Sequence, residues 1–535
     1  MNSVQRFLVV LFVMGGVCSG GVADAATYYV STNGSDGRSC SEAQSPSSPM
    51  RTLNNATACL SAGDTLYLRG GVYDESLYVN EYNPRRGGMA SGTSWGNKVR
   101  IAAYPGDSAV WLRPSSDATS AGGIGYVIWI DFTLSYVEFD GINLDGSNLS
   151  GGVLWMSTTN GNNPHHIRYQ NAEIAAGHIN GAAIGLGAHA LIGATGAHEI
   201  LNVRIHGGGL PGQCGLGCAS YGIYVAGPNN LIDGCDIYDV GGAGIHIYNG
   251  GGDGANNNIV RNNRIHDITR TGNPDQVWGI IVVGANNQLY NNTIWGINVG
   301  NVNNQQGNAG ISLLGASGTQ VFNNTIYGNT GWGLVVGPTT SGSVLRNNIS
   351  YGSGKGNYVD IGIGTFQSNN LFTDPRFVNA GGADFRLNSD SPAIDQGVYL
   401  STYPYDQQGV SRPQGAGFDI GAFEFTGSSS APAAPAAPAA PAAPAAPAPP
   451  AAPVGLSPSP DGTRIPGATF VVDSALNVWT LGPGNELLKN GSQAASGYGF
   501  AILAYQGVIY VQGDDYNWWR WTGSTYAYYG GNPPI

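Results

Sequence analysis

Charged side chains are scarce in this 535-residue chain: they make up 10% of it, and the net charge is −12. A surface that binds nucleic acid needs clustered Lys and Arg, so nucleic acid is not an expected partner. Long apolar runs are also missing after the N-terminal region, which excludes a membrane-spanning helix in the rest of the chain. A polyanionic substrate stays open, provided that a local basic groove receives it.

The N-terminus has the pattern of a secretory signal peptide. Arg6 precedes an apolar run from Phe7 to Val13, and Ala23-Asp24-Ala25 fits an Ala-x-Ala cleavage site. Residues 1–25 are therefore expected to be a signal peptide, and the mature protein is expected to be secreted or extracellular, with association at the cell surface as an option.

Cysteine is rare, with six residues in the whole chain. Export makes disulfides plausible, and Cys40 with Cys59 is expected to pin an N-terminal cap. Cys214 and Cys218 are expected to staple a loop, with a zinc site as the competing interpretation. Cys235 is expected to be a buried free thiol.

Glycine is abundant, with 84 residues, and the chain carries a repeated pattern. Five segments share an aliphatic residue, a polar turn rich in Asn, an Ile and an aromatic residue or His, at intervals of 28 to 32 residues: 200–206, 232–238, 260–266, 289–295 and 321–327. Each of these segments is followed by a second element, in which Gly precedes an aliphatic residue, any residue and another aliphatic residue. The second elements are 221–225, 243–247, 278–282, 309–313 and 332–336. These elements are short, β-branched and cut by Gly and Asn, so we predict that each repeat is one coil of a β-solenoid.

Stacked coils place equivalent residues roughly 4.8 Å apart, so these residues form ladders. An inward apolar ladder is predicted at Leu144, Ile174, Ile205, Ile237, Ile265, Ile294, Ile326 and Ile349. The turn before it carries residues that tolerate left-handed backbone, namely Gly141, Asn171, Asn202, Gly234, Asn262, Asn291, Asn323 and Asn347. The Asn amides are expected to bond to one another between coils.

At these residues the chain resembles the right-handed parallel β-helix proteins, the pectate-lyase-like superfamily, over roughly residues 26 to 427. Thr27-Tyr-Tyr-Val, the segment Ala62–Tyr73 and the Asp-rich series from Asp374 to Glu424 are similar to the opening and closing parts of secreted bacterial members. The family includes pectate lyases, polygalacturonases, alginate lyases, epimerases and phage tailspikes, so the fold alone does not select a reaction. The resemblance implies that substrate lies along the Gly-Ile-x-Val strands and their flanking loops.

The expected organisation is an all-β chain with a solenoid and a second, smaller unit. The solenoid with its cap and closing segment takes residues 26–427, and an Ala/Pro-rich linker of extended polyproline geometry takes 428–453. Residues 454–535 are expected to form a small aromatic-rich β module. The Asp residues of the closing segment are expected to form turns.

The module contains the run Trp518-Trp519-Arg520-Trp521. In a strand, Trp518 and Arg520 would lie on one face, with Trp519 and Trp521 on the other. One face can form the core, and the other would offer flat rings on which sugars stack. The alternatives are that all these aromatics form the core, or that they bind a protein partner.

The face of the Gly-Ile-x-Val strands is where chemistry is expected. Tyr224, His246 and Tyr248 form its most reactive patch, and the long loops 207–220, 267–277 and 296–309 are expected to wall a groove. His246 is a candidate acid or base, with a hydrogen-bonded surface residue as the alternative.

Asp239 and Asp267 occupy matching positions two residues past the ladder Ile. Adjacent coils would bring them near the ~5–5.5 Å separation of carboxylates in a retaining glycosidase. With Asp253 they could instead bind Ca²⁺, and turn capping is the third interpretation. Two outward rows lie on the other strands. Arg204, Asp236 and Arg264 could form an alternating ion-pair ladder, whose exposed pairs contribute little, about 0–1 kcal/mol each. The aromatic row is expected to pack beneath the loops, with a sugar track as the alternative; it is His206, Tyr238, His266, Trp295 and Tyr327.

The chain departs from its relatives in catalytic signatures. Polyuronate lyases of this fold use a Lys or Arg base, yet Lys98, Lys355 and Lys489 are the only lysines and none falls on a Gly-Ile-x-Val strand. Arg270 is the best basic candidate. The polygalacturonase and mannuronan-epimerase signatures are missing as well.

Two functions follow from these observations. The first is an enzyme acting on extracellular polysaccharide, a glycoside hydrolase or polysaccharide lyase, with Asp239, Asp267 and His246 as acid/base residues and Arg270 stabilising charge. The second is a non-catalytic surface or matrix protein that binds polysaccharide through the C-terminal module.

Overall fold

The structure is a computed structural model that describes residues 25–427 and 458–530, with residue 533, apart from short segments. The segments outside the description are 81–88, 117–124, 150, 158–162, 178–180, 189–195, 209–219, 249–253, 269–276, 299–307, 401–402, 466–469, 482–485, 491, 499–500, 513–516 and 523–525. The predicted signal peptide, apart from Ala25, and the predicted linker therefore lie outside the described residues.

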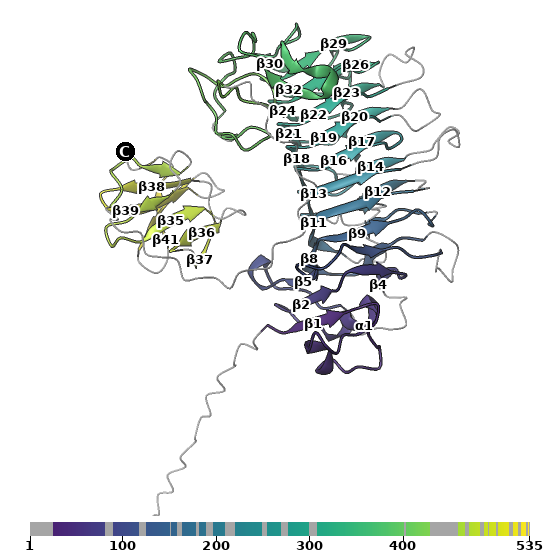
Figure 1. The fold of residues 1–535 in the computed structure, drawn as a ribbon. Coiled ribbons are helices and arrows are strands. Elements are labelled where there is room, and N and C mark those ends of the chain that lie inside the picture. Colours follow the sequence, from purple (N-terminus) through teal and green to yellow (C-terminus); the bar gives the residue numbers. More distant parts are fainter. Residues whose placement is uncertain are drawn as a thin grey trace, which may run out of the picture.

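The long domain is a stack of parallel β coils (Figure 1), as predicted. One strand of each coil joins a ten-stranded sheet, here called sheet B. Its strands, in stacking order, are β4 (Leu77–Asn80), β7 (Ile128–Asp131), β10 (Leu154–Ser157), β12 (Ala182–Ala188), β14 (Tyr221–Val225), β17 (Ala243–Tyr248), β20 (Trp278–Val283), β23 (Ala309–Leu313), β26 (Trp332–Val336) and β29 (Gly356–Asp360).

The other strands form a 20-stranded sheet, here called sheet A, in two columns. The first column is β1 (Thr27–Val30), β2 (Thr65–Leu68), β5 (Val99–Ala103), β8 (Ser135–Asp140), β11 (His165–Ala175), β13 (Glu199–His206), β15 (Leu231–Asp233), β18 (Ile259–Arg261), β21 (Gln288–Tyr290), β24 (Gln320–Phe322), β27 (Val344–Arg346) and β30 (Phe366–Ser368). The second column is β3 (Gly71–Tyr73), β6 (Val110–Leu112), β9 (Ile142–Asp145), the later parts of β11 and β13, β16 (Asp236–Tyr238), β19 (Arg264–His266), β22 (Thr293–Trp295), β25 (Thr325–Tyr327) and β28 (Ile349–Tyr351).

The bend between the two columns confirms the predicted turn ladder. Every predicted Gly and Asn there, from Gly141 to Asn347, has a positive φ between 52° and 71°. The apolar ladder from Leu144 to Ile326 is fully buried. Its last member was assigned wrongly, because Ile326 pairs with Ser350 and Ile349 pairs with Thr325. The coil of β28 has its Ile one position earlier, so Ile349 packs outward against the closing segment instead.

Buried amides run up the inside of this bend. Asn263, Asn292, Asn324 and Asn348 are fully buried, and each side-chain Nδ2 donates to the Oδ1 of the next Asn at 2.9–3.0 Å, ending on Asn370. Each Oδ1 also accepts the backbone N–H of the coil before it. These amides satisfy polar backbone that would otherwise be buried without partners.

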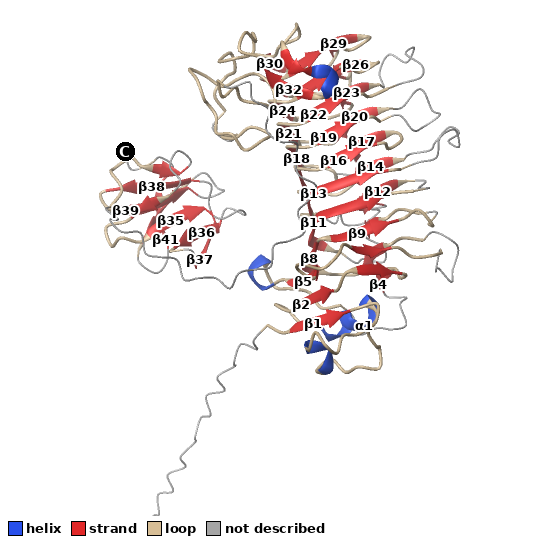
Figure 2. Cartoon of the chain, viewed as in Figure 1, coloured by secondary structure: helices blue, strands red, loops and turns tan. Residues whose placement is uncertain are grey.

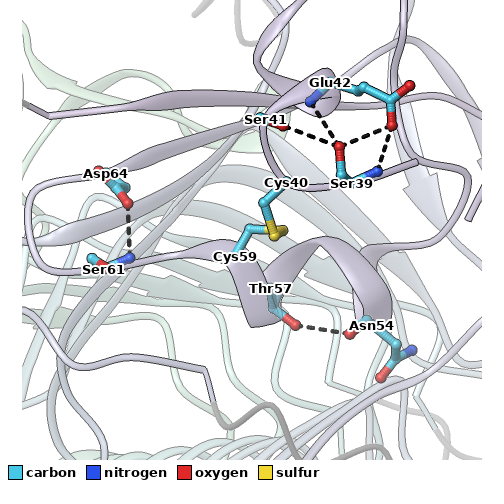
Figure 3. Close-up of a disulfide and its surroundings, with 9 residues drawn as sticks. All are labelled: Ser39, Cys40, Ser41, Glu42, Asn54, Thr57, Cys59, Ser61 and Asp64. Atoms are coloured by element: carbon cyan, nitrogen blue, oxygen red, sulfur yellow. Dashed lines mark hydrogen bonds between the residues drawn. A yellow bond between two sulfur atoms is a disulfide. The ribbon is translucent and has the colours of Figure 1, made fainter. Parts of the chain in front are cut away.

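A cap closes the N-terminal end. It contains α1 (Leu53–Ala56) and the 3₁₀ turns η1 (Glu42–Gln44), η2 (Thr57–Cys59) and η3 (Trp95–Asn97). The predicted Cys40–Cys59 disulfide joins the segment just before η1 to the last residue of η2 (Figure 3). Cys235 is free and buried, as predicted, and burial raises the pKa of its thiol to about 12. Cys214 and Cys218 lie outside the described residues.

The closing segment contains β31 (Phe377–Asn379), η4 (Ala380–Gly382) and β32 (Asp384–Leu387), and its later loops return along sheet A. Gln407 Nε2 donates to the carbonyl oxygens of Asn263 and Asn291, at 3.0 and 2.9 Å. The Tyr403 ring lies 4.1 Å from that of Tyr290. The segment therefore binds coils more than a hundred residues earlier in the chain.

The C-terminal module consists of two antiparallel sheets (Figure 2). One contains β33 (Arg464–Ile465), β38 (Ala501–Tyr505), β39 (Val508–Gln512), β40 (Trp518–Trp521) and β41 (Tyr526–Gly530), and the other contains β34 (Val471–Val472), β35 (Val478–Leu481), β36 (Glu486–Lys489) and β37 (Ser492–Tyr498). They share a core around Trp479. Within the described residues, no helix has the length and apolarity to cross a membrane.

Candidate functional site

The outer face of sheet B presents one side chain from each coil in a continuous ladder. Ile245 and Ile247 of β17 point inward and are fully buried, so His246 between them points outward. The strand register places the equivalent outward residues at Tyr78, Trp129, Trp155, Gly185, Tyr224, His246, Ile281, Ser312, Val335 and Val359.

Aromatic rings occupy the first half of this ladder. The Tyr78 and Trp129 ring centroids are 6.0 Å apart, and Tyr126 bridges Trp129 and Trp155 at 5.6 and 5.5 Å. All four side chains are half-buried. A Cβ on Gly185 would lie 2.3 Å from the Trp155 ring, so glycine is required for that ring to lie flat over the next coil.

His246 lies within a group of tyrosine rings. Its ring centroid is 4.6 Å from Tyr221, 5.3 Å from Tyr224 and 5.2 Å from Tyr248. Only 9% of the residue is exposed, and burial lowers the pKa of the imidazole to about 4, so it is neutral at neutral pH. Its Nδ1 is buried and has no hydrogen-bond partner within the described structure. A neutral imidazole with a spare nitrogen can accept a proton.

The middle of this face, around His246, has no charged residue in its described strands. Strands β12, β14, β17 and β20 contain no Asp, Glu, Lys or Arg. Burial raises the pKa of Tyr221 and Tyr224 to about 12, so both phenols stay protonated. The arrangement offers flat rings and hydroxyl groups, which suit the stacking of a hydroxyl-rich ligand.

Asp239 and Asp267 lie on adjacent coils at the turns that lead into sheet B. Both have φ 51°, and the Asp239 backbone N–H donates to the Asp267 carbonyl oxygen at 3.2 Å. The Asp267 side chain is 60% exposed, and its Oδ2 lies 2.8 Å from Nδ1 of His266. The two residues therefore lie on neighbouring coils and form part of the turn, while the predicted spacing of their carboxylates stays a prediction.

Other predicted residues fall outside the description. Arg270 and Asp253 lie in segments 269–276 and 249–253. Among the residues that the structure describes, no group of three His, Cys, Asp or Glu could hold a metal ion. The Ca²⁺ site that includes Asp253 stays a prediction.

The aromatic row on the second column of sheet A packs against itself. Rings of His206, Tyr238, His266 and Trp295 stack in sequence at 5.2, 5.1 and 4.3 Å. Phe385 of the closing segment packs on Trp295 at 5.3 Å and on Tyr327 at 5.4 Å. This arrangement agrees with the packing role that the sequence favoured.

In the C-terminal module, β40 alternates as expected. Trp521 packs on Trp479 of the core at 5.1 Å, and Trp519 lies 5.5 Å from Tyr528. Trp518 faces the other way and is only 1% exposed, with the Arg464 guanidinium 5.2 Å above its ring. The most exposed aromatics described in the module are Tyr528 and Tyr529.

Sequence reasoning missed the first half of the sheet B ladder. Tyr78, Trp129 and Trp155 lie in coils whose repeat is too degenerate to align by eye. The available signal was the alternation in Ile128-Trp-Ile and Leu154-Trp-Met, where an aromatic residue stands between two buried aliphatic residues.

A family model described as "right handed beta helix region" matches residues 188–302 and 222–397. Comparison with curated proteins finds no match. Similar solved structures include pectate lyase Pel9A, with 16% identity over 76% of this chain and 97% of that one and a TM-score of 0.49. A rhamnogalacturonan lyase has 14% identity, covers 68% and 97%, and has a TM-score of 0.42. A lacto-N-biosidase from Eubacterium ramulus has 12% identity, covers 65% and 67%, and has a TM-score of 0.43.

Identities this low carry nothing about activity. The family-model match covers the coils from β13 to β30, and the same parallel pairing continues through the earlier coils to β1. The long domain of this chain is a right-handed parallel β-helix.

Proposed function

We propose that the protein acts on an extracellular polysaccharide that lies along the outer face of sheet B. The observation that supports this most is the ring ladder from Tyr78 through Trp155 to Tyr224. Each coil adds roughly 4.8 Å, about the length of one sugar residue, so a glycan parallel to the solenoid axis meets one outward ladder position per residue. Because the strands around His246 carry no charge, the segment bound there is neutral or presents its uncharged face.

The proposed activity is glycoside hydrolysis or polysaccharide lysis. His246 is the proposed general base, because it is the ladder residue that can take up a proton and its imidazole is neutral at neutral pH. Asp239 and Asp267 remain the carboxylate pair for hydrolysis, and Arg270 remains the residue that would stabilise a developing negative charge in lysis.

A second function is non-catalytic binding through the C-terminal module. Exposed Tyr528 and Tyr529 favour it, since they offer rings on a sheet whose Trp518 and Trp521 are already packed. In that case the solenoid is a rigid spacer. Trp518, Trp519 and Trp521 then support the binding face rather than contacting the sugar with their full rings.

The test is a panel of neutral and uronic polysaccharides with the full chain. Products are read as new reducing ends and as the ultraviolet absorbance of unsaturated uronates. Reducing ends without unsaturation identify a hydrolase, and reducing ends with unsaturation identify a lyase. His246→Gln should lower turnover at least a hundredfold, the range for loss of a general base, while Trp129→Ala should mainly raise KM. Product from no polymer would reject the enzyme and leave binding by the module.

A further inference from the structure

A trough opens on sheet A, away from the sheet B ladder. Its volume is about 1150 Å³, and its floor comes from the bend and the second column between β13 and β22. Its far wall is the closing segment, at residues 382–386 and 403–409. This volume is large enough for several sugar residues, because sites for drug-sized ligands measure roughly 300–1,000 Å³.

Most charged groups that line the trough are already paired. Asp233 Oδ2 accepts from Nε of Arg261 at 2.6 Å, and the same guanidinium donates to the Tyr290 hydroxyl at 2.9 Å. Asp384 holds Arg386 through Nε at 2.8 Å. Together with the backbone N–H groups that bind Asp406, these pairs form a rigid, electrically balanced wall.

Two arginines on the floor are different. Arg204 approaches Glu173 only to 3.9 Å, and Arg264 approaches Asp236 only to 3.8 Å. Both distances are too long for hydrogen bonds, and neither side chain makes another hydrogen bond in the described structure. Their side chains are 35% and 39% exposed. The floor thus presents two guanidinium groups that make no hydrogen bond in the described structure, and apart from the buried Nε of Arg264 their donors are left for a ligand.

The position of these arginines is fixed by the fold. Arg204, Asp236 and Arg264 are in direct register, so the two guanidinium groups belong to coils two apart, roughly 10 Å at the base. Arg264 also lies over the Trp295 ring at 5.3 Å, and Trp295 is held between His266 and Phe385. The Asp236 carboxylate between them accepts from His266, at 3.2 Å.

The rim supplies rings. Tyr405 of the closing segment is 55% exposed at the trough, although Tyr403 beside it is buried against Tyr290. A flat exposed ring next to planar polar groups such as Asn202 and Asn262 is a typical arrangement for saccharide binding. Free guanidinium donors add a preference for a carboxylate.

We propose that this trough is a second saccharide site, specific for an acidic oligosaccharide whose carboxylates bind Arg204 and Arg264. It is independent of the sheet B face. The trough would prefer ligands with negative charge, whereas the sheet B ladder would prefer the flat, uncharged face of a sugar ring. The site exists only because the closing segment folds back over earlier coils.

The experiment is calorimetric titration of the full chain with tetragalacturonate, and with cellotetraose as the neutral control. We expect saturable binding of the acidic probe that weakens as salt rises, and at least tenfold weaker binding in Arg204→Gln/Arg264→Gln. The matched control is Arg113→Gln, an exposed arginine that pairs with Asp145 outside the trough. Tyr405→Ala tests the rim without touching a charge, and we expect a loss of several-fold.

Each result has a definite meaning. Loss of tetragalacturonate binding in the Arg204/Arg264 variant, with Arg113→Gln and Trp155→Ala unchanged, supports the trough. Equal binding by wild type and the double variant overturns it, as does no binding of the acidic probe by wild type. Binding that is lost in Trp155→Ala assigns the acidic probe to sheet B instead.

Discussion

The outer ladder of sheet B changes character between β17 and β20. On the earlier coils it is aromatic and half-buried, from Tyr78 to Tyr224, and it ends at His246. On the later coils it is small or aliphatic and almost fully buried, with Ile281 at 5%, Ser312 at 0% and Val335 at 2% exposure. Trp332, Leu314 and other side chains cover those later positions. The same backbone geometry thus builds a surface in one half and a satellite core in the other.

This difference shows that a solenoid face is not one continuous groove. Identical register and spacing leave the side chains free to vary from coil to coil. A ligand on sheet B therefore has a natural end near His246, where rings give way to covered aliphatic side chains.

The largest effect should come from placing a charge in the covered half. Val335→Asp puts an unpaired carboxylate at a position that is 2% exposed and should lower the free energy of unfolding by about 3 kcal/mol or more. Tyr248→Asp, at a position 40% exposed, should cost less than about 1 kcal/mol. Urea unfolding of both variants measures the difference, and equal losses would mean that the two halves are not distinct.

The second prediction concerns acid. His246 has its pKa lowered by burial from 6.5 to about 4, so the unfolded chain binds more protons between these values. The contribution of the neutral imidazole to the free energy of unfolding is therefore fully present above pH about 6.5. It is lost as the pH falls toward about 4, and the loss amounts to up to about 3 kcal/mol. Fully buried His198, with a pKa lowered to about 3, acts in the same direction.

His246→Gln isolates the contribution of this residue. The loss of Tm between pH 6.5 and 4.5 should be smaller in the variant than in the wild type, while His198 and the carboxylates contribute equally to both. Parallel Tm curves for the two proteins would contradict the assigned burial of His246.

The third prediction tests the function of the aromatic half. Trp155→Ala should weaken binding of the sheet B polysaccharide by about tenfold, which corresponds to about 1.4 kcal/mol. Val335→Ala, at the equivalent ladder position in the covered half, should leave affinity unchanged. Titration of the polysaccharide that the panel identifies measures both. Equal losses in the two variants would mean that binding depends on general stability.

The smallest effect comes from buried hydroxyl groups. Ser312 Oγ is buried without a partner in the described structure, whereas Ser350 Oγ donates to the Asn357 carbonyl oxygen at 2.6 Å. Ser312→Ala should be neutral or stabilise by up to about 1 kcal/mol, and Ser350→Ala should destabilise by about 1 kcal/mol. Both residues are 0% exposed, so thermal unfolding of the pair separates hydrogen bonding from burial.

The sequence predicted the coils because their determinants are local. Asn or Gly at the bend shows that the backbone is left-handed there, and the buried aliphatic residue three positions later sets the register. The prediction failed at Ile349, because Ser350 occupies the ladder position of that coil and Ile stands one residue earlier, which only the pairing of Ile326 with Ser350 reveals.

The candidate sites were predictable only in part. Tyr224, His246 and Tyr248 were placed together correctly because neighbouring coils share a clear repeat. The trough was beyond sequence reasoning, because Gln407 meets Asn263 across 144 residues of chain. Nothing local to either segment encodes that contact, since it depends on the number of coils between them.

The buried Asn column has an electrical consequence. From Asn263 to Asn348 every side-chain amide donates toward the C-terminal coils, and Asn230 and Asn258 do the same in a second column. Parallel amide dipoles in a low-dielectric interior add and polarise one another. The solenoid therefore contains two aligned rows of amide dipoles, whose positive ends point toward the C-terminal coils. This charge separation arises without any ionised group.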